Sequence, residues 1–312
     1  MPQMTPSQAR VIDPVLSEVA RGYRSNAAPV ANLLFPTVAV NQRGGRVVSF
    51  GPEDFKIYNT ARAPGSATKR VSFGYSSAGF SLVDYRLEGS VPLQMLQEGQ
   101  SVPGLDNASI AIAKVRNLQE LEREKQAADL ALTAASYGAT NKLTLASGDR
   151  WDEAAGEPFE DVDNAKEAIR KQIGMRPNVL TLAPKVAVAL RRNPKVLDRL
   201  STARDRPPAT MAQLAALFDV ETVVEAGAIY HDGTNFVDVW GTFAHLAYTT
   251  PASLAEMGSP NFGYTYQLAN YPVAEEAYYD RNTETWYFPV ADCRQPQLVG
   301  AGAGFLFTTA VS

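Results

Sequence analysis

Apolar and polar residues alternate through residues 46–87, which predicts a long extended excursion early in the chain. The alternation is clearest at Val48–Phe50 and Val71–Tyr75, and Ala63–Ser66 forms the expected tip between the two strands. Period-two alternation of this kind is typical of strands. Such an exposed strand pair leaves backbone donors and acceptors that another chain can pair with. Its length exceeds what a self-contained domain needs.

Four basic residues lie along this excursion: Lys56, Arg62, Lys69 and Arg70. Charged side chains on exposed strands commonly prevent uncontrolled edge pairing. Two interpretations stand: an ordinary solvated hairpin, or an arm whose cations contact a neighbouring subunit. The length of the excursion favours the contact with a neighbouring subunit.

Residues 104–137 change to helical periodicity and predict one long helix, with Asp106 or Asn107 as N-cap. At ~1.5 Å per residue, this helix would be roughly 50 Å long, far longer than an average globular helix. Its apolar stripe is Ile112, Val115, Leu118, Leu121, Ala128 and Leu132, and its opposite face carries Arg116, Glu120, Arg123, Glu124 and Asp129. A coiled-coil dimer is the alternative, but alanine dilutes the stripe and the heptads are few.

Residues 161–250 alternate helix and strand and predict a compact α+β domain. The expected helices are Val162–Ile173, Pro184–Arg192, Lys195–Leu200 and Met211–Phe218, the last capped by Thr210, and the expected strands are Asn178–Leu182, Val220–Val224, Phe236–Trp240 and Ala244–Thr249. Adjacent prolines make Arg204–Ala209 a loop, which holds the cations Arg204 and Arg206.

The last part, 261–312, is rich in Tyr, Phe and Val. Tyr264–Tyr279 and Glu284–Val290 predict a large antiparallel pair joined by a turn at Asp280–Thr283. The glycine-rich run Gly300–Phe305 predicts a flexible or tightly packed strand, since its spacing matches neither a dinucleotide nor a P-loop template.

Composition narrows the class of protein. The chain has 312 residues, 45% of them hydrophobic and 20% charged, which is typical of a globular protein long enough for two domains. The single cysteine, Cys293, excludes an internal disulfide and a multi-cysteine metal site. The sequence has no apolar run of membrane-spanning length, so no membrane partner is expected.

Charge argues against a dedicated nucleic-acid-binding surface, and the candidate chemistry argues against an enzyme. Residues 1–50 hold five Arg against Asp13 and Glu18, too mild an excess for a dedicated nucleic-acid surface. The two histidines, His231 and His245, fit no ligand motif, and each is interpreted as structural or exposed in a turn. Cys293 is interpreted as a packing residue, and the acid pairs Asp152–Glu153, Glu160–Asp161 and Glu275–Glu276 as solvated. We therefore expect no catalytic residue, no cofactor and no metal.

The order of segments resembles the HK97-like major capsid proteins of tailed bacteriophages. The segment Pro14–Gly51 (PVLSEVARGYRSNAAPVANLLFPTVAVNQRGGRVVSFG) resembles the arm that enters the extended E-loop of that family. Leu180–Leu200 (LTLAPKVAVALRRNPKVLDRL) and Ala209–Tyr230 (ATMAQLAALFDVETVVEAGAIY) resemble successive parts of its axial domain. These motifs are soft, and it is their conjunction over the whole chain that carries the resemblance.

The resemblance implies an α+β, HK97-like fold with a defined domain plan. Its parts would be residues 1–45 as N-terminal arm, 46–90 as E-loop, 91–160 as peripheral domain with spine helix 104–137, 161–255 as axial domain, and 256–312 as return strands of the peripheral domain.

The resemblance also implies a function and partners. The chain would self-assemble into hexamers and pentamers of an icosahedral shell around double-stranded DNA, in the virion, after assembly in the host bacterial cytoplasm. Because no extra N-terminal scaffold segment is visible, a separate scaffolding protein is expected, with a portal and a decoration protein as further partners. Lys56, Arg62, Lys69, Arg70, Arg204 and Arg206 would contact neighbouring subunits. The alternatives are an encapsulin-like compartment shell that encloses a cargo enzyme, and an enzyme built on the α+β domain.

Overall fold

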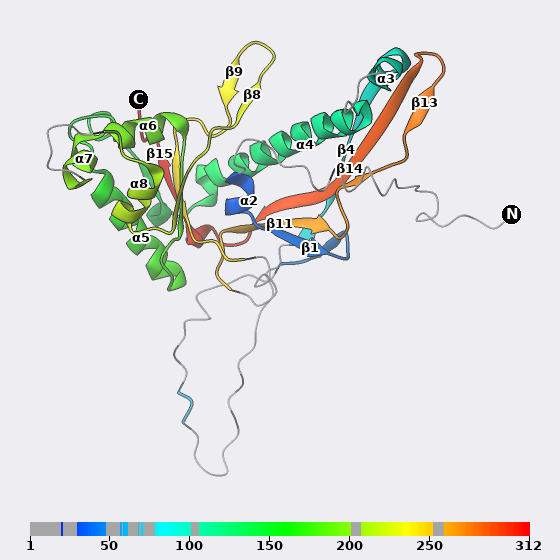
Figure 1. Cartoon of the computed structure of the whole chain (residues 1–312). Helices are drawn as coiled ribbons and strands as arrows, with labels where there is room; N and C mark the ends of the chain where they lie inside the picture. Colours follow the sequence, from blue (N-terminus) through cyan, green and yellow to red (C-terminus); the bar gives the residue numbers. More distant parts are fainter. Residues whose placement is uncertain are drawn as a thin grey trace.

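One long strand, β14 (Thr285–Leu298), organises half of the molecule (Figure 1). The computed structural model describes residues 20, 30–47, 57, 59–61, 68, 70, 79–100, 106–200, 207–251 and 259–312. One edge of β14 pairs in register with β4 (Val83–Pro92), from Thr285 opposite Pro92 to Arg294 opposite Val83. The other edge takes three shorter strands in turn: β13 (Tyr278–Asp280), β12 (Val273–Ala274) and β11 (Gly263–Leu268). Strand β1 (Thr37–Val40) closes this six-stranded sheet in parallel with β11.

The long helix α4 (Asn107–Leu132) packs on β14 and β4 and extends along them (Figure 1). The Asp106 carboxylate caps it by accepting hydrogen bonds from Ala108 N and Ser109 N. The short helix α3 (Leu93–Gln100) connects β4 to the residues before α4. Helix α4 has 26 residues, so it is shorter than the predicted range 104–137. Residues 101–105 lie outside the described residues, and beyond Leu132 the chain forms 3-10 turns instead of continuing the helix.

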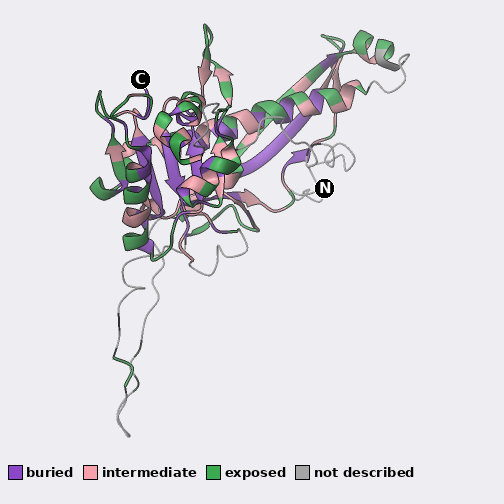
Figure 2. Cartoon of the chain, turned by 60° about the vertical axis from the view of Figure 1, so that its left-hand side comes forward, coloured by how far each residue is buried: buried purple, intermediate pink, exposed green. Residues whose placement is uncertain are grey.

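The second half is a five-stranded sheet in the order β5-β15-β10-β6-β7. Helices α5, α6, α7 and α8 surround it at the left of Figure 1. The strands are β5 (Lys142–Thr144), β15 (Gly304–Thr308), β10 (Ala244–Ala247), β6 (Val179–Leu182) and β7 (Thr222–Glu225), and the helices are α5 (Pro158–Ile173), α6 (Pro184–Arg192), α7 (Pro194–Leu200) and α8 (Met211–Phe218). Every residue of β6 and of β10 is buried, so the centre of this sheet is a core layer (Figure 2).

Two small ribbons stand apart from the main sheets. Strand β2 (Gly44–Arg46) pairs antiparallel with β3 (Gly79–Ser81), which joins the two ends of the predicted excursion. Strand β8 (Ile229–His231) pairs with β9 (Phe236–Asp238) in a hairpin that protrudes at the top of Figure 1. The expected strands Val48–Phe50 and Val71–Tyr75, and the expected tip Ala63–Ser66, lie outside the described residues.

Residues 30–40, expected within an N-terminal arm, pack into the body of the protein. Helix α2 (Val30–Leu34) is buried at Val30, Ala31 and Leu34, and Phe35 is fully buried beside it. Strand β1 follows Pro36 and pairs with β11. Residues 1–19 and 21–29 lie outside the described residues.

Several strands pair across the expected segment boundaries. Residues 83–90, which we expected in the E-loop, belong to β4 and pair with β14. Strands β5 and β15, from the expected parts 91–160 and 256–312, join the five-stranded sheet with β10, β6 and β7. Tyr264–Tyr279 is not one strand but three, and β14 continues to Leu298, well beyond the predicted end at Val290. Strand partners are chosen by burial in the folded chain, which local alternation does not encode.

Candidate intersubunit surface

The structure describes only one of the six cations predicted to contact a neighbour. Arg70 is exposed, whereas Lys56, Arg62, Lys69, Arg204 and Arg206 lie outside the described residues. All the described residues between 57 and 70 are exposed, and the Ile57 side chain is 100% exposed. A fully exposed isoleucine on a segment without cover from its own chain is a candidate for contact with another chain.

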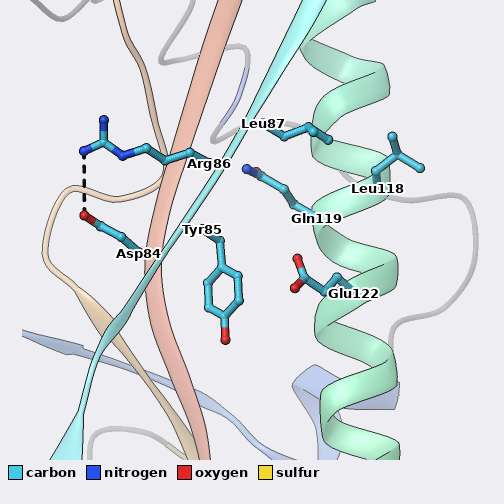
Figure 3. Close-up of a pocket in the computed structure, with 7 residues that line it drawn as sticks. All are labelled: Asp84, Tyr85, Arg86, Leu87, Leu118, Gln119 and Glu122. Carbon is cyan, nitrogen blue, oxygen red and sulfur yellow. Dashed lines mark ion pairs between the residues drawn. The ribbon is translucent and has the colours of Figure 1, made fainter.

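A groove between β4 and α4 forms a second exposed surface (Figure 3). It has a volume of about 350 Å³ and is lined by Asp84, Tyr85, Arg86, Leu87, Leu118, Gln119 and Glu122. Its lining includes Leu87 from the strand and Leu118 from the helix, which are 40% and 54% exposed (Figure 3). The predicted apolar stripe of the spine helix is therefore wrong at Leu118, which lies on the open face.

Charged residues form one rim of this groove. Arg86 lies 3.4 Å from Glu275 and 3.6 Å from Asp84, and Arg43 lies 3.3 Å from Asp84 on the other side. Burial alone would raise the pKa of Asp84, but Arg43, a hydrogen bond with Cys293 and the charge of Arg86 together hold that pKa below its ordinary value. The groove combines apolar walls with fixed charges, which suits the binding of a chain segment. Its lining residues do not form a pair of nucleophile and general base.

Beneath the groove, buried charges attach the spine helix to β14. Arg294 is fully buried and donates to Asp292 Oδ2 at 2.5 Å and to Gln119 O at 2.7 Å. Arg116 lies 3.5 Å from the same Asp292 oxygen, and Gln267 donates to the other oxygen at 2.7 Å. Burial would raise the pKa of Asp292, but Arg294 and Arg116 lower it below its ordinary value, so the carboxylate stays ionised.

Sequence reasoning placed Arg116, Arg123 and Glu124 on the face opposite the apolar stripe, yet all three are buried, each with 6% or less of its surface exposed. The Arg123 guanidinium donates to Thr37 Oγ1 at 2.7 Å and to Asn32 Oδ1, and burial lowers its pKa. The helix thus binds the segment around α2 and β1 through charges. The sequence signal for this pairing was the cluster of cations and acids on one face of the helix. The predicted apolar stripe alone was too narrow to hold the helix in place, so charged residues were candidates for burial.

His245 of β10 and Tyr137 form a buried contact between two titratable side chains beside the five-stranded sheet. The Tyr137 hydroxyl donates to Ala131 O at 2.6 Å and lies 2.8 Å from His245 Nε2. Since that hydroxyl has one proton, His245 Nε2 must donate to it. Burial lowers the pKa of His245 to about 3 and keeps the ring neutral. The interpretation of His245 as structural agrees with this geometry, whereas His231 lies exposed on the β8–β9 hairpin.

The remaining chemical candidates have structural surroundings. Cys293 is fully buried, and burial raises the pKa of its thiol to about 11, which disfavours the nucleophilic thiolate. The Asp161 carboxylate accepts a hydrogen bond from Trp151 Nε1 at 2.8 Å, so this member of an acid pair serves packing. The described part of the chain contains no group of three His, Cys, Asp or Glu side chains placed to hold a metal ion. Within those same residues, no helix has the length and apolar character needed to cross a membrane.

Comparison with known proteins decides the family. No family model matches the chain. The major capsid protein of Burkholderia phage BcepMu is 31% identical over 307 residues, which cover 97% of this chain and 97% of the relative. The chain belongs to the phage major capsid proteins. Its role is therefore structural, in the capsid of the virion.

Solved structures agree with this family assignment. The crystal structure of a phage-related protein from Bordetella bronchiseptica matches with a TM-score of 0.80 and 38% identity, covering 97% of this chain and 98% of that chain. The fold of this capsid protein is HK97-like. The SrpI encapsulin of Synechococcus elongatus shares the fold with a TM-score of 0.55 at 13% identity, covering 95% and 94% of the two chains. The encapsulin alternative is thus less supported than a phage capsid.

Proposed function

We propose that this chain self-assembles into hexamers and pentamers of an icosahedral shell that encloses the double-stranded DNA genome of a tailed phage. The observation that carries the proposal is the 31% identity to a phage major capsid protein over 97% of both chains. The exposed groove between β4 and α4, and the uncovered residues around Ile57, support it because a shell needs several separate contact surfaces on each subunit. Symmetric repetition then lets modest contacts add up.

In this proposal the exposed segments are contact arms. The E-loop, with Lys56, Arg62, Lys69 and Arg70, lies across an adjacent subunit. The loop with Arg204 and Arg206 meets its equivalents around the capsomer axis. The five-stranded sheet with α5 to α8 is the axial domain, and the six-stranded sheet with α4 is the peripheral domain. Assembly takes place in the host bacterial cytoplasm, and the subunit carries out no enzymatic step.

The same proposal assigns further partners by their chemistry. Packaged DNA meets the inner surface as a polyanion. The shell binds this DNA weakly, because the DNA must leave the shell when the genome is released. A scaffolding protein, a portal and a decoration protein complete the particle. Support for weak DNA contact comes from the formal net charge of −4, which disfavours tight phosphate binding.

The test is direct imaging of the purified chain, expressed alone and together with the other capsid genes of its phage. Negative-stain electron microscopy is expected to show closed shells, and averaging is expected to show rings of six and five. A chain that stays monomeric under all conditions would overturn the proposal. Shells that contain a co-purifying cargo enzyme and no nucleic acid when isolated from the native source would favour the encapsulin alternative.

A further inference from the structure

The β8–β9 hairpin has one face that its own chain covers and one that it does not. Register places Ile229 opposite Asp238, Tyr230 opposite Val237, and His231 opposite Phe236. Directly paired residues share a face and neighbours along a strand alternate. Ile229, His231, Phe236 and Asp238 therefore form one face of the ribbon, and Tyr230 and Val237 form the other.

The Tyr230 face is directed toward the body of the protein. Lys125 of α4 places its Nζ 5.9 Å from the centre of the Tyr230 ring, and Tyr230 packs against the main core. The outer face keeps Ile229 50% exposed and Phe236 74% exposed, with His231 in edge contact with Phe236. A two-stranded hairpin alone is only marginally stable in water, so an uncovered apolar face on such a ribbon is a natural place for a partner.

The hairpin is held in shape before any partner arrives. Asp232 Oδ1 accepts hydrogen bonds from Thr234 N at 2.8 Å and from Asn235 N at 2.7 Å, and His231 Nδ1 accepts one from Gly233 N at 3.1 Å. At the base, Val239 N donates to Ala228 O at 2.9 Å. A preorganised element loses little conformational entropy on binding, which favours a specific contact.

The charges around the hairpin indicate which chain segment binds its outer face. Residues 207–280 contain no lysine or arginine, and their acids are Asp219, Glu221, Glu225, Asp232, Asp238, Glu256, Glu275, Glu276 and Asp280. Residues 55–83 show the opposite pattern: Lys56, Arg62, Lys69 and Arg70, with no aspartate or glutamate. The two segments are complementary in sign, and in each of them apolar side chains such as Phe236 and Ile57 stand exposed. Complementary potentials of this kind fix register and suppress wrong partners.

The hairpin and residues 56–70 are two different parts of the subunit. The hairpin stands at the top of Figures 1 and 2. A contact between two different patches is heterologous and closes into a ring when the rotation between copies allows it. A ring of subunits is what the proposed function requires.

The geometry points to the outer face of the β8–β9 hairpin as the docking site for residues 56–70 of a second copy of this chain. In this arrangement Phe236 and Ile229 cover apolar side chains of the incoming segment, while Asp238 on the same face meets its cations. The inference rests on the proposed shell function and adds to it the surface that receives the arm.

Photo-crosslinking in assembled shells tests the docking site. Phe236 is replaced by benzoylphenylalanine, and subunits with and without ¹⁵N label are mixed before assembly, so that mass spectrometry separates contacts between copies from contacts within one copy. The expected result is crosslinking to peptides within residues 56–70 of another copy, in shells and not in free subunits. Crosslinks to another hairpin, to a different segment or to a decoration protein, or no crosslink at all, would overturn the inference.

Charge reversal tests the electrostatic part. Asp238→Lys is expected to lower the yield of shells on the order of tenfold, and Arg70→Glu in the same chain is expected to restore part of it. Asp232 is left unchanged because its carboxylate holds the turn. Asp149→Lys, an exposed charge reversal outside the hairpin, is the matched control and should assemble normally. Assembly of Asp238→Lys at wild-type yield would overturn the inference. Absence of shells from the unmodified chain would instead count against the proposed function.

Discussion

The Glu124 carboxylate joins three separate parts of the chain through two hydrogen bonds. Oε1 accepts from Trp240 Nε1 at 2.8 Å, and Oε2 accepts from Ala31 N at 2.9 Å. Trp240 follows the β8–β9 hairpin, Ala31 lies in α2, and Glu124 lies in α4. Burial raises the pKa of Glu124 above its ordinary value, although both hydrogen bonds favour the ionised form. Helix α4 is thereby fixed to α2 and to Trp240, which follows the β8–β9 hairpin, through one side chain.

Glu124→Gln should lower the free energy of unfolding of the unassembled subunit by about 1–3 kcal/mol, because the amide nitrogen would face one of the two buried donors. Urea unfolding followed by tryptophan fluorescence measures this. Glu122→Gln, at an exposed position two residues earlier, is the control and should stay within about 0.5 kcal/mol of wild type. Equal effects of the two variants would contradict the structural role of Glu124.

Removing the charge of Asp292 should lower the free energy of unfolding of the subunit. Asp292→Asn leaves Arg294 and Arg116 buried without their carboxylate, and a loss of about 3–5 kcal/mol is expected for such a broken buried pair. The double variant Asp292→Asn with Arg294→Met should lose less than the sum of the single variants, because one uncompensated charge is then removed. A double-mutant cycle by urea unfolding measures the coupling.

The matched control for this cycle is the exposed pair Lys125 and Asp129, whose side chains are 38% and 62% exposed. Its coupling should be below about 1 kcal/mol, as for other surface pairs. Additive effects at Asp292 and Arg294 would show that the buried charges do not act together.

The stability of the subunit should fall in acid because of His245. The pKa of this residue is about 3 in the folded protein and 6.5 in the reference state, so the unfolded chain binds the extra proton first. The contribution of His245 is therefore full above pH 6.5 and is lost as the pH falls toward 3, by up to about 1.4 kcal/mol per pH unit.

The variant His245→Gln keeps a side-chain N–H that can reach Tyr137 and removes the titration. Its urea midpoint, measured at several pH values from 7 down to 4, should depend less on pH than that of the wild type. His231→Gln, at an exposed position, should leave the wild-type pH dependence unchanged. A His245→Gln curve parallel to the wild type would rule out His245 as the source.

A glycine on β15 should not tolerate a methyl group. A Cβ at Gly304 would lie 2.5 Å from the Phe262 ring and 3.1 Å from His245 Nε2, both buried. Gly304→Ala is expected to destabilise the subunit by about 1–3 kcal/mol through overpacking, seen as a lower Tm by differential scanning fluorimetry. Gly227→Ala is the control, since no heavy atom lies within 4 Å of its added Cβ. An unchanged Tm for Gly304→Ala would mean that the β15 layer can shift.

Local elements were predicted well where the residues that decide them lie within a few positions of one another in the sequence. Helix α8 begins after Thr210 with a full capping box to Gln213, and α6 runs from Pro184 to Arg192 as expected. The strand predicted over Gly300–Phe305 is right only from Gly304, where the tightly packed β15 begins, because Ala301–Ala303 form a 3-10 turn. In each case the deciding residues are neighbours in sequence.

The candidate contact surfaces were harder to predict. The cations of the excursion were visible in the sequence, but the groove at Leu87 and Leu118 required knowing that β4 lies beside α4. The outer face of the β8–β9 hairpin required the strand register that separates Phe236 from Tyr230. Side chains far apart in sequence create both surfaces, and no local pattern specifies such neighbours.

By itself the sequence determined the type and order of the main helices, the caps of α4 and α8, and the resemblance to the capsid family. Caps and periodicity act over a few residues and are encoded locally. Only the tertiary structure decided that β14 pairs with β4, that β15 joins the five-stranded sheet, and that Arg116, Arg123 and Glu124 turn inward. Those choices depend on which distant groups can bury apolar surface and satisfy a charge together, and only the folded chain brings those groups into contact.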